Sequence, residues 1–133
     1  MKPALKRLFA VGAIVEIAVG LGALAFPEPL IGLLLDGPVA NTGVFLARLF
    51  GVAIIALGLT WWFVRGEPDG RGARECALGF IAYNLGAGFL IMLQALAATQ
   101  SVPLLWPVAL FHAGLGLAFT AVLLGRSPAP EAK

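Results

Sequence analysis

Five polar side chains interrupt the long apolar stretches of this sequence and are its candidates for chemistry. They are Glu16, Arg48, Asn84, Gln94 and His112. If these stretches cross a membrane, an ionisable side chain near the bilayer centre costs at least about 2.5–3.5 kcal/mol. Such residues face the interior of a helix bundle and mark functional sites by default.

Small residues three or four positions away place four of the five on helix faces that other helices approach closely. These neighbours are Gly12, Ala13 and Gly20 for Glu16, Gly51 for Arg48, Gly88 for Asn84, and Ala109 and Gly116 for His112. We therefore predict an intramembrane polar cluster with Glu16, Arg48 and His112 at its centre and the two amides as hydrogen-bonding neighbours. The cluster could fix helix register, carry protons or bind a ligand, and the residues leave these roles open.

The sequence contains no recognisable catalytic, nucleotide-binding or metal-binding motif. One histidine and one glutamate on separate helices fall short of the three or four protein ligands of a zinc site. Ser101 and Ser127 lie at predicted helix ends, which serves Ser-His-Asp chemistry poorly, and the lone Cys76 excludes an internal disulfide. Tyr83 is expected to make an interhelical hydrogen bond. We therefore expect no catalytic residue, no metal site and no cofactor, and we favour a protein that is not an enzyme.

The composition is that of an integral membrane protein. The 133 residues are 60% hydrophobic and 12% charged, whereas soluble domains carry roughly 45–50% apolar and about 25% charged residues. A chain of this composition cannot cover itself with polar surface in water, so we expect it to contact a lipid bilayer. Its length suits a single transmembrane domain over residues 1–133.

Four mostly apolar windows are long enough to span a membrane as helices of about 20 residues. They cover residues 4–26, 44–64, 76–98 and 102–124. Pro27 follows the first window, Asn41 and Thr42 offer caps before the second, and Ser101 offers a cap for the fourth. The sequence therefore predicts an all-α membrane protein, a bundle of four transmembrane helices.

The apolar segment Leu30–Leu35 lies in the loop after the first window, between Pro29 and Asp36. It is too short to cross a bilayer and too apolar to stand in water, so we predict a short interfacial or re-entrant helix. Two roles are open for it. It could be a lid over the outer end of the bundle, or a surface that docks a partner or gates a pocket.

Basic residues lie on one side of the predicted bundle, and they indicate its orientation through the positive-inside rule. They are Lys2, Lys6, Arg7, Arg65, Arg71, Arg74, Arg126 and Lys133, with Arg48 as the exception. They form no run, which argues against a nucleic-acid partner. We therefore predict a multi-pass protein with both termini in the cytoplasm, and we predict that Trp61 and Trp62 beside Arg65 form an inner aromatic anchor.

The stretch Phe45–Gly51, followed by Tyr83 with Asn84 and then by His112, resembles small bacterial four-helix membrane proteins of the DoxX-like kind. The resemblance implies a location in the bacterial cytoplasmic (inner) membrane. DoxX is associated with quinone-linked redox chemistry, so the resemblance also implies a membrane quinone near the bundle. The helix that holds Glu16 is similar to small multidrug transporters in its mid-helix carboxylate, although this chain is longer.

Two classes of function follow from these patterns. We rank first an accessory or scaffold membrane protein, which acts in a homo-oligomer or as a subunit of a larger membrane complex. The alternative is a proton-coupled small-molecule transporter, or a quinone-interacting protein, that uses the Glu/Arg/His cluster. The first class predicts that the small-residue faces pack against partner chains, whereas the second predicts a cavity that reaches Glu16 and His112 from one side.

Overall fold

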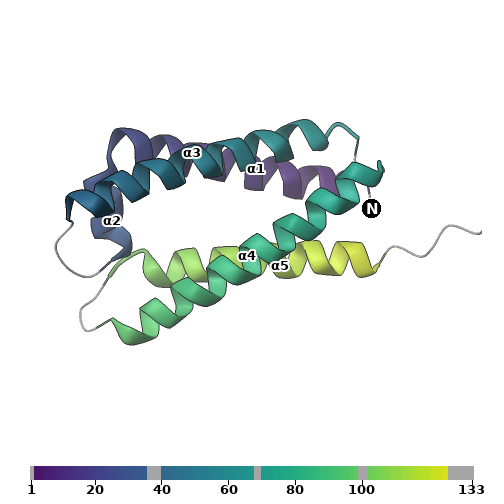
Figure 1. Ribbon diagram of the computed structural model, residues 1–133. Coiled ribbons are helices and arrows are strands. Elements are labelled where there is room, and N and C mark those ends of the chain that lie inside the picture. Colours follow the sequence, from purple (N-terminus) through teal and green to yellow (C-terminus); the bar gives the residue numbers. More distant parts are fainter. Residues whose placement is uncertain (1, 36–39, 68–69, 99–101, 126–133) are drawn as a thin grey trace, which may run out of the picture.

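The computed structural model describes residues 2–35, 40–67, 70–98 and 102–125, and its regular elements there are all helices (Figure 1). They are α1 (Lys2–Ala25), α2 (Pro27–Leu34), α3 (Asn41–Val64), α4 (Arg71–Ala97) and α5 (Leu105–Leu124). The helices α1, α3, α4 and α5 are long and apolar enough to cross a membrane. The predicted all-α fold, with four long apolar helices and a short helix after the first, is confirmed.

The helix ends differ from the apolar windows for local reasons. α4 begins at Arg71, because the polar residues before the apolar window continue the helix. α3 begins at Asn41, and its N-cap is Ala40, so Asn41 is not the cap. α5 begins at Leu105, and Pro107 falls in its first turn. Backbone N–H groups in the first turn have no partner within the helix, so the missing N–H of proline costs no hydrogen bond there. Several residues used in the predictions lie outside the described ranges, namely Asp36, Ser101, Arg126, Ser127 and Lys133.

α1 packs closely against α3 because glycines face each other across the contact. A Cβ atom on Gly20 would lie 2.7 Å from the carbonyl oxygen of Gly51, and one on Gly51 would lie 2.8 Å from that of Gly20. A Cβ atom on Gly58 would lie 3.0 Å from the carbonyl oxygen of Ala13. Small residues let membrane helices approach closely, so these positions join α1 and α3 into what we call the first helix pair.

α4 and α5 form the second helix pair in the same way. A Cβ atom on Gly88 would lie 3.0 Å from the backbone nitrogen of Ala113. One on Gly116 would lie 2.6 Å from the side chain of Leu85. The long helices thus associate as two antiparallel pairs, each joined along a row of small residues.

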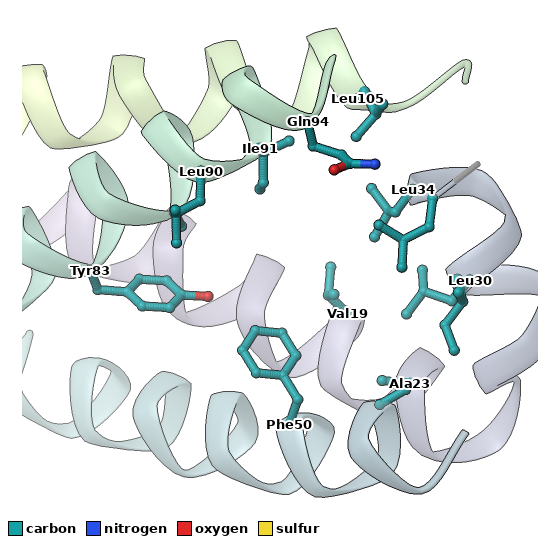
Figure 2. A pocket seen from close by; sticks show the side chains of 14 residues that line it. Val19, Ala23, Leu30, Leu34, Phe50, Tyr83, Leu90, Ile91, Gln94 and Leu105 are labelled. Atoms are coloured by element: carbon teal, nitrogen blue, oxygen red, sulfur yellow. The ribbon is translucent and has the colours of Figure 1, made fainter. Parts of the chain in front are cut away.

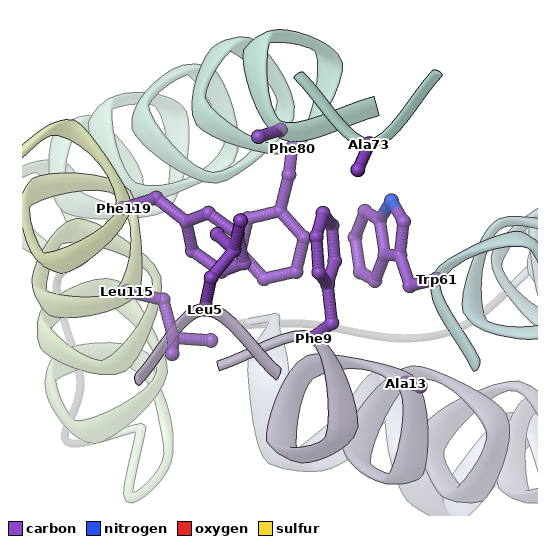
Figure 3. Packing of buried hydrophobic residues seen from close by; sticks show 9 residues of the cluster. Leu5, Phe9, Ala13, Trp61, Ala73, Phe80, Leu115 and Phe119 are labelled. Carbon is purple, nitrogen blue, oxygen red and sulfur yellow. The ribbon is translucent and has the colours of Figure 1, made fainter. Parts of the chain in front are cut away.

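The two pairs meet around a buried aromatic core at the end of the bundle where α1 begins (Figure 3). Each long helix supplies one ring, from Phe9, Trp61, Phe80 and Phe119. Phe80 stacks on Phe119 with ring centroids 3.9 Å apart, and the Trp61 centroid lies 4.0 Å from that of Phe80. Gly12 makes room for this core, because a Cβ atom there would collide with the Phe80 ring. The core therefore holds the two pairs together at this end.

Trp61 belongs to the core, and its predicted role in an interfacial anchor is wrong. Its side chain is only 1% exposed. Neighbouring residues on a helix point about 100° apart, so Trp61 and Trp62 cannot share one outward face. Trp62 is the tryptophan that contacts Arg65, since the Arg65 guanidinium carbon lies 3.4 Å from the Trp62 ring centroid and Arg65 donates a hydrogen bond to the carbonyl oxygen of Trp62.

At the opposite end the two pairs diverge, and α2 lies at this wider end (Figure 1). α2 contacts both helices of the first pair. The backbone N–H of Leu104, just before α5, donates a hydrogen bond to the carbonyl oxygen of Leu33 across 3.4 Å. The short helix thus bridges the two pairs where the long helices separate.

Candidate functional site

Glu16 on α1 faces α4 and accepts a hydrogen bond from Tyr83. The side chain of Glu16 is only 3% exposed, and the Tyr83 hydroxyl donates to its Oε2 atom across 3.1 Å. A buried polar group requires a partner, and here the partner comes from the other helix pair. The hydrogen bond therefore links the two pairs between the aromatic core and the diverging end.

Asn84 on α4 and His112 on α5 form a second buried polar contact. The Nδ2 atom of Asn84 donates to the carbonyl oxygen of Phe80 across 3.0 Å, and its Oδ1 atom lies 2.9 Å from Nδ1 of His112. A backbone carbonyl only accepts, so the amide nitrogen must face Phe80 and the amide oxygen must face His112. Nδ1 of His112 is therefore the donor, and in the neutral imidazole Nε2 is left as the acceptor.

Tyr83 brings these two contacts together. Its ring lies edge-on to the imidazole of His112, with centroids 5.7 Å apart, while its hydroxyl reaches Glu16. We call Glu16, Tyr83, Asn84 and His112 the polar junction. Sequence reasoning gives Tyr83 an interhelical hydrogen bond, which the structure confirms, but it leaves Tyr83 out of the cluster. The sequence does contain a signal that Tyr83 belongs to the cluster. Tyr83 is next to Asn84 in an apolar window, and a hydroxyl group in such surroundings needs a hydrogen-bond partner.

Gln94 lies apart from the polar junction. A separation from position 84 to position 94 corresponds to about 15 Å along a helix. The side chain is half-buried, and Figure 2 shows its carboxamide between Leu105 and Leu34. Gln94 therefore marks the wide end of the space between the pairs, while Asn84 belongs to the narrow end.

Arg48 is exposed on α3, and the structure does not bring it to Glu16. The buried residues of α3 are Gly51, Ile54, Gly58 and Trp61. This row continues toward the start of the helix at Ala47, so Arg48 points about 100° away from it. The pairs also diverge at this level, which leaves the flank of α3 uncovered. The polar cluster expected from the sequence is therefore divided, with Arg48 and Gln94 outside the junction.

An apolar cavity of about 570 Å³ lies between the diverging helix pairs (Figure 2). Its walls come from Val19 and Ala23 of α1, Leu30, Ile31, Leu34 and Leu35 in and after α2, Ala47 and Phe50 of α3, Tyr83, Ala87, Leu90, Ile91 and Gln94 of α4, and Leu105 of α5. Apart from the Tyr83 hydroxyl and the Gln94 carboxamide, these side chains are hydrocarbon. The cavity thus suits an apolar molecule that has a polar group at one end or at both.

The cavity is accessible from the side of the bundle. Phe50 and Leu90 both line it, yet their side chains are 53% and 65% exposed. They belong to α3 and α4, which pack in different pairs. The cavity therefore opens to the surface of the protein between these two helices.

The chemistry of the site is that of proton-exchanging groups beside an apolar cavity. The phenol of Tyr83 contacts the carboxyl of Glu16 through its hydroxyl and the imidazole of His112 through its ring, and groups of these kinds give and take protons in enzymes. In the part of the chain that the structure describes, no cluster of three or more histidine, cysteine, aspartate or glutamate residues could hold a metal ion. Every buried side-chain nitrogen or oxygen atom of that part has a hydrogen-bond partner.

Comparison with known proteins supplies a family for the chain. The searches among curated proteins and among solved structures give no match. The resemblance to DoxX-like proteins, and the quinone that it implies, therefore stay predictions. A family model described as Domain of unknown function (DUF8292) matches residues 10–126, a range that includes the polar junction and the cavity. This polytopic membrane protein, with its four candidate spans, belongs to the DUF8292 family.

Proposed function

We propose that this protein binds an apolar small molecule within the bilayer, in the cavity between its two helix pairs. The cavity carries the proposal. Its volume of about 570 Å³ lies within the range of about 300–1,000 Å³ that small-molecule sites occupy. Its walls favour a hydrophobic molecule with few polar groups, a class that includes membrane quinones and lipid-like compounds.

The packing supports this small-molecule function over the accessory or scaffold role. A scaffold is expected to bury its small-residue faces against partner chains. The glycines that flank the candidate polar residues instead pack within this chain, at Gly20, Gly51, Gly88 and Gly116. The cavity ends at Tyr83, which contacts both Glu16 and His112. A proton-coupled small-molecule function predicts a cavity that reaches Glu16 and His112, and the residues that line this cavity include Tyr83 but neither of those two.

Proton coupling is the second step of the proposal. A ligand that accepts a hydrogen bond from the Tyr83 hydroxyl would displace Glu16 from that hydroxyl. If the ligand carries a basic atom, that atom would take the proton from the carboxyl of Glu16, which would be left as a carboxylate. The positions of the basic residues support an orientation with both termini in the cytoplasm, this junction deep in the bilayer and the α2 end outside. In this arrangement the wide end of the cavity lies in the outer half of the bilayer, and the ligand enters it from the lipid of the outer leaflet. The resemblance to DoxX-like proteins is what suggests a bacterial cytoplasmic membrane.

A pair of matched tryptophan variants tests the binding function. Ala87 lines the cavity, whereas Ala53 is exposed on α3 and does not line it, so Ala87→Trp fills the cavity while Ala53→Trp adds the same ring outside it. The proteins are purified in mild detergent, and co-purifying lipids and quinones are identified by mass spectrometry. We expect one apolar compound in the wild type and in Ala53→Trp that is depleted at least fivefold in Ala87→Trp. Equal amounts in all three proteins would exclude the cavity as the binding site.

Oligomer formation is a second candidate function, and one exposed helix face favours it. Gly79, Ala82 and Gly86 form a row on the outer face of α4, and no heavy atom of another part of the chain lies within 4 Å of a Cβ atom built on either glycine. Such a row allows close helix approach. Native mass spectrometry of wild type and Gly86→Leu tests it, and a dimer that dissociates in the variant supports a self-associating subunit.

A further inference from the structure

We infer that the cavity holds one acyl chain of a membrane lipid, with the methyl end of the chain at Tyr83 and its ester group at Gln94. This inference rests on the proposed binding function and names the chemical class of the ligand. It depends neither on proton coupling nor on the DoxX resemblance. It comes from the length of the cavity, the positions of its polar groups and its opening at the side of the bundle.

The cavity runs along α4 for the depth of one lipid leaflet. Its lining residues on this helix are Tyr83, Ala87, Leu90, Ile91 and Gln94, whose spacing places them on one face. The rise from position 83 to position 94 is about 16 Å. The hydrocarbon core of a bilayer is about 30 Å thick, so one leaflet contributes about 15 Å. An extended acyl chain of one leaflet therefore matches the length of the cavity.

The two ends of the cavity lie at the depths that such a chain requires. α4 covers Arg71–Ala97 and is a candidate membrane span, so Tyr83 lies next to its midpoint and Gln94 lies in its last turn. Leu105, which lines the cavity, is the first residue of α5. The wide end is thus at the membrane surface, where lipid ester groups lie, and the narrow end is at the centre, where acyl chains end.

The polar groups of the cavity favour this direction of the chain. Of the described side chains that line it, those of Tyr83 and Gln94 carry polar atoms, and none is charged. The Tyr83 hydroxyl already donates to Glu16, so a terminal methyl group leaves this hydrogen bond intact. The carboxamide of Gln94 has two N–H donors, and one of them suits the carbonyl oxygen of an ester.

The side opening allows the chain to enter while the head group stays at the membrane surface. Phe50 on α3 and Leu90 on α4 both line the cavity and are exposed, and Figure 2 shows them extending from opposite helices. A lipid in the bilayer already has its chain parallel to these helices. The chain needs only to move sideways between them, and the polar head group avoids the unfavourable transfer into hydrocarbon.

Trp61 is placed to detect a chain in the cavity, because bromine atoms quench tryptophan fluorescence at short range. Its ring centroid lies 5.8 Å from that of Tyr83, and its side chain is only 1% exposed, which keeps it from direct contact with lipid outside the bundle. Trp62→Phe combined with Trp106→Phe leaves Trp61 as the one tryptophan of the chain. This full-length protein is purified in glyco-diosgenin, a detergent without an acyl chain. It is then titrated with phosphatidylcholine that carries bromine either near the methyl end or near the ester group of one chain.

We expect the methyl-end bromines to quench Trp61 at least threefold more than the ester-end bromines, with saturation at a single lipid. Ala87→Phe fills the cavity and should abolish this quenching, whereas Ala53→Phe, outside the cavity, should leave it unchanged. Equal quenching by the two lipids, stronger quenching from the ester end, or no quenching overturns the inference.

Gln94→Leu tests the position of the ester group. The variant loses the carboxamide and keeps an apolar wall, so the lipid concentration at half-maximal quenching should rise about threefold. An unchanged concentration overturns the assigned position. A second measurement needs no tryptophan variant, since native mass spectrometry of the wild type in the same detergent should show a single bound phosphatidylcholine. Ala87→Phe should retain at least fivefold less, and equal retention in the two proteins overturns the inference.

The failure of this inference differs from failure of the proposed function. If the brominated lipids do not quench Trp61 but Ala87→Trp still depletes a co-purifying apolar compound, the cavity binds another class of molecule, and only the inference is overturned. If Ala87→Trp depletes no compound and Ala87→Phe retains as much lipid as the wild type, the cavity is not a site, and both are overturned.

Discussion

The hydroxyl of Tyr83 on α4 lies 3.1 Å from Oε2 of Glu16 on α1, and this hydrogen bond crosses from one helix pair to the other. Within each pair, glycines bring the helix backbones together. Between the pairs, contact rests on the aromatic core, on this hydrogen bond and on α2. The Tyr83–Glu16 bond therefore joins the pairs between the aromatic core and the end at which they diverge around the cavity.

Removing the Tyr83 hydroxyl should destabilise the protein. Tyr83→Phe leaves a buried oxygen of Glu16 without its donor, which costs about 1–3 kcal/mol of the free energy of unfolding. Combining it with Glu16→Leu in a double-mutant cycle, followed by unfolding in sodium dodecyl sulfate, should give a coupling energy of about 0.6–1.7 kcal/mol. Thr60→Val is the control, because the Thr60 hydroxyl is exposed and bonds to Ala56 in its own helix. A coupling energy of zero would mean that the bond contributes nothing to joining the pairs.

Gly12→Ala should loosen the aromatic core. The added methyl group would collide with the Phe80 ring, and that ring cannot move aside because it lies between Trp61 and Phe119. Overpacking of this kind costs about 1–3 kcal/mol, measured as a fall in the midpoint of thermal unfolding in detergent. Gly79→Ala is the matched control, since no heavy atom of another segment lies within 4 Å of its Cβ position. Equal midpoints for the two variants would contradict the packing at Gly12.

Gly20→Ala should separate α1 from α3. Its Cβ atom would lie 2.7 Å from the carbonyl oxygen of Gly51, and a backbone atom in a helix cannot rotate away as a side chain does. We expect a loss of about 1–3 kcal/mol and faster hydrogen exchange of the amides in both helices. Gly22→Ala, on the same helix with nothing within 4 Å of its Cβ position, should exchange like the wild type. Slow exchange in both variants would argue against close contact at Gly20.

His112 should carry its proton on Nδ1 when the imidazole is neutral, because Oδ1 of Asn84 accepts a hydrogen bond from that atom. The chain has 1 histidine, so ¹⁵N NMR of histidine-labelled protein reports this ring alone. We expect a protonated Nδ1 signal and an unprotonated Nε2 signal. Asn84→Leu removes the acceptor and should abolish the preference for this tautomer. A neutral ring protonated on Nε2 in the wild type would contradict the assigned orientation of Asn84.

The predicted orientation in the membrane can be tested with single cysteines. In a Cys76→Ala background, Gly32→Cys places a thiol on exposed α2, and Glu67→Cys places one in the exposed turn after α3. A membrane-impermeant maleimide added to intact bacterial cells should label Gly32→Cys directly and Glu67→Cys only after permeabilisation. The reverse pattern would place the termini outside.

Local features of the sequence predict the helices and part of the site. Hydropathy predicts four spans and a short helix after the first, because length and apolarity are properties of contiguous residues. Small residues on the same face as Glu16, Asn84 and His112 indicate that these side chains point toward other helices, since that face follows from the helical repeat.

The sequence by itself determines that the chain forms four membrane-length helices. It also determines that the helix faces carrying Glu16, Asn84 and His112 pack against other helices. Only the tertiary structure decides that the helices associate as two pairs, that Tyr83 bonds to Glu16, and that Arg48 remains exposed. The physical reason is that the helical repeat determines the direction in which a side chain points, whereas the packing of the helices determines which helix that side chain contacts. The angle at which the pairs diverge from the aromatic core is set by contacts between residues far apart in the chain, and that angle creates the cavity.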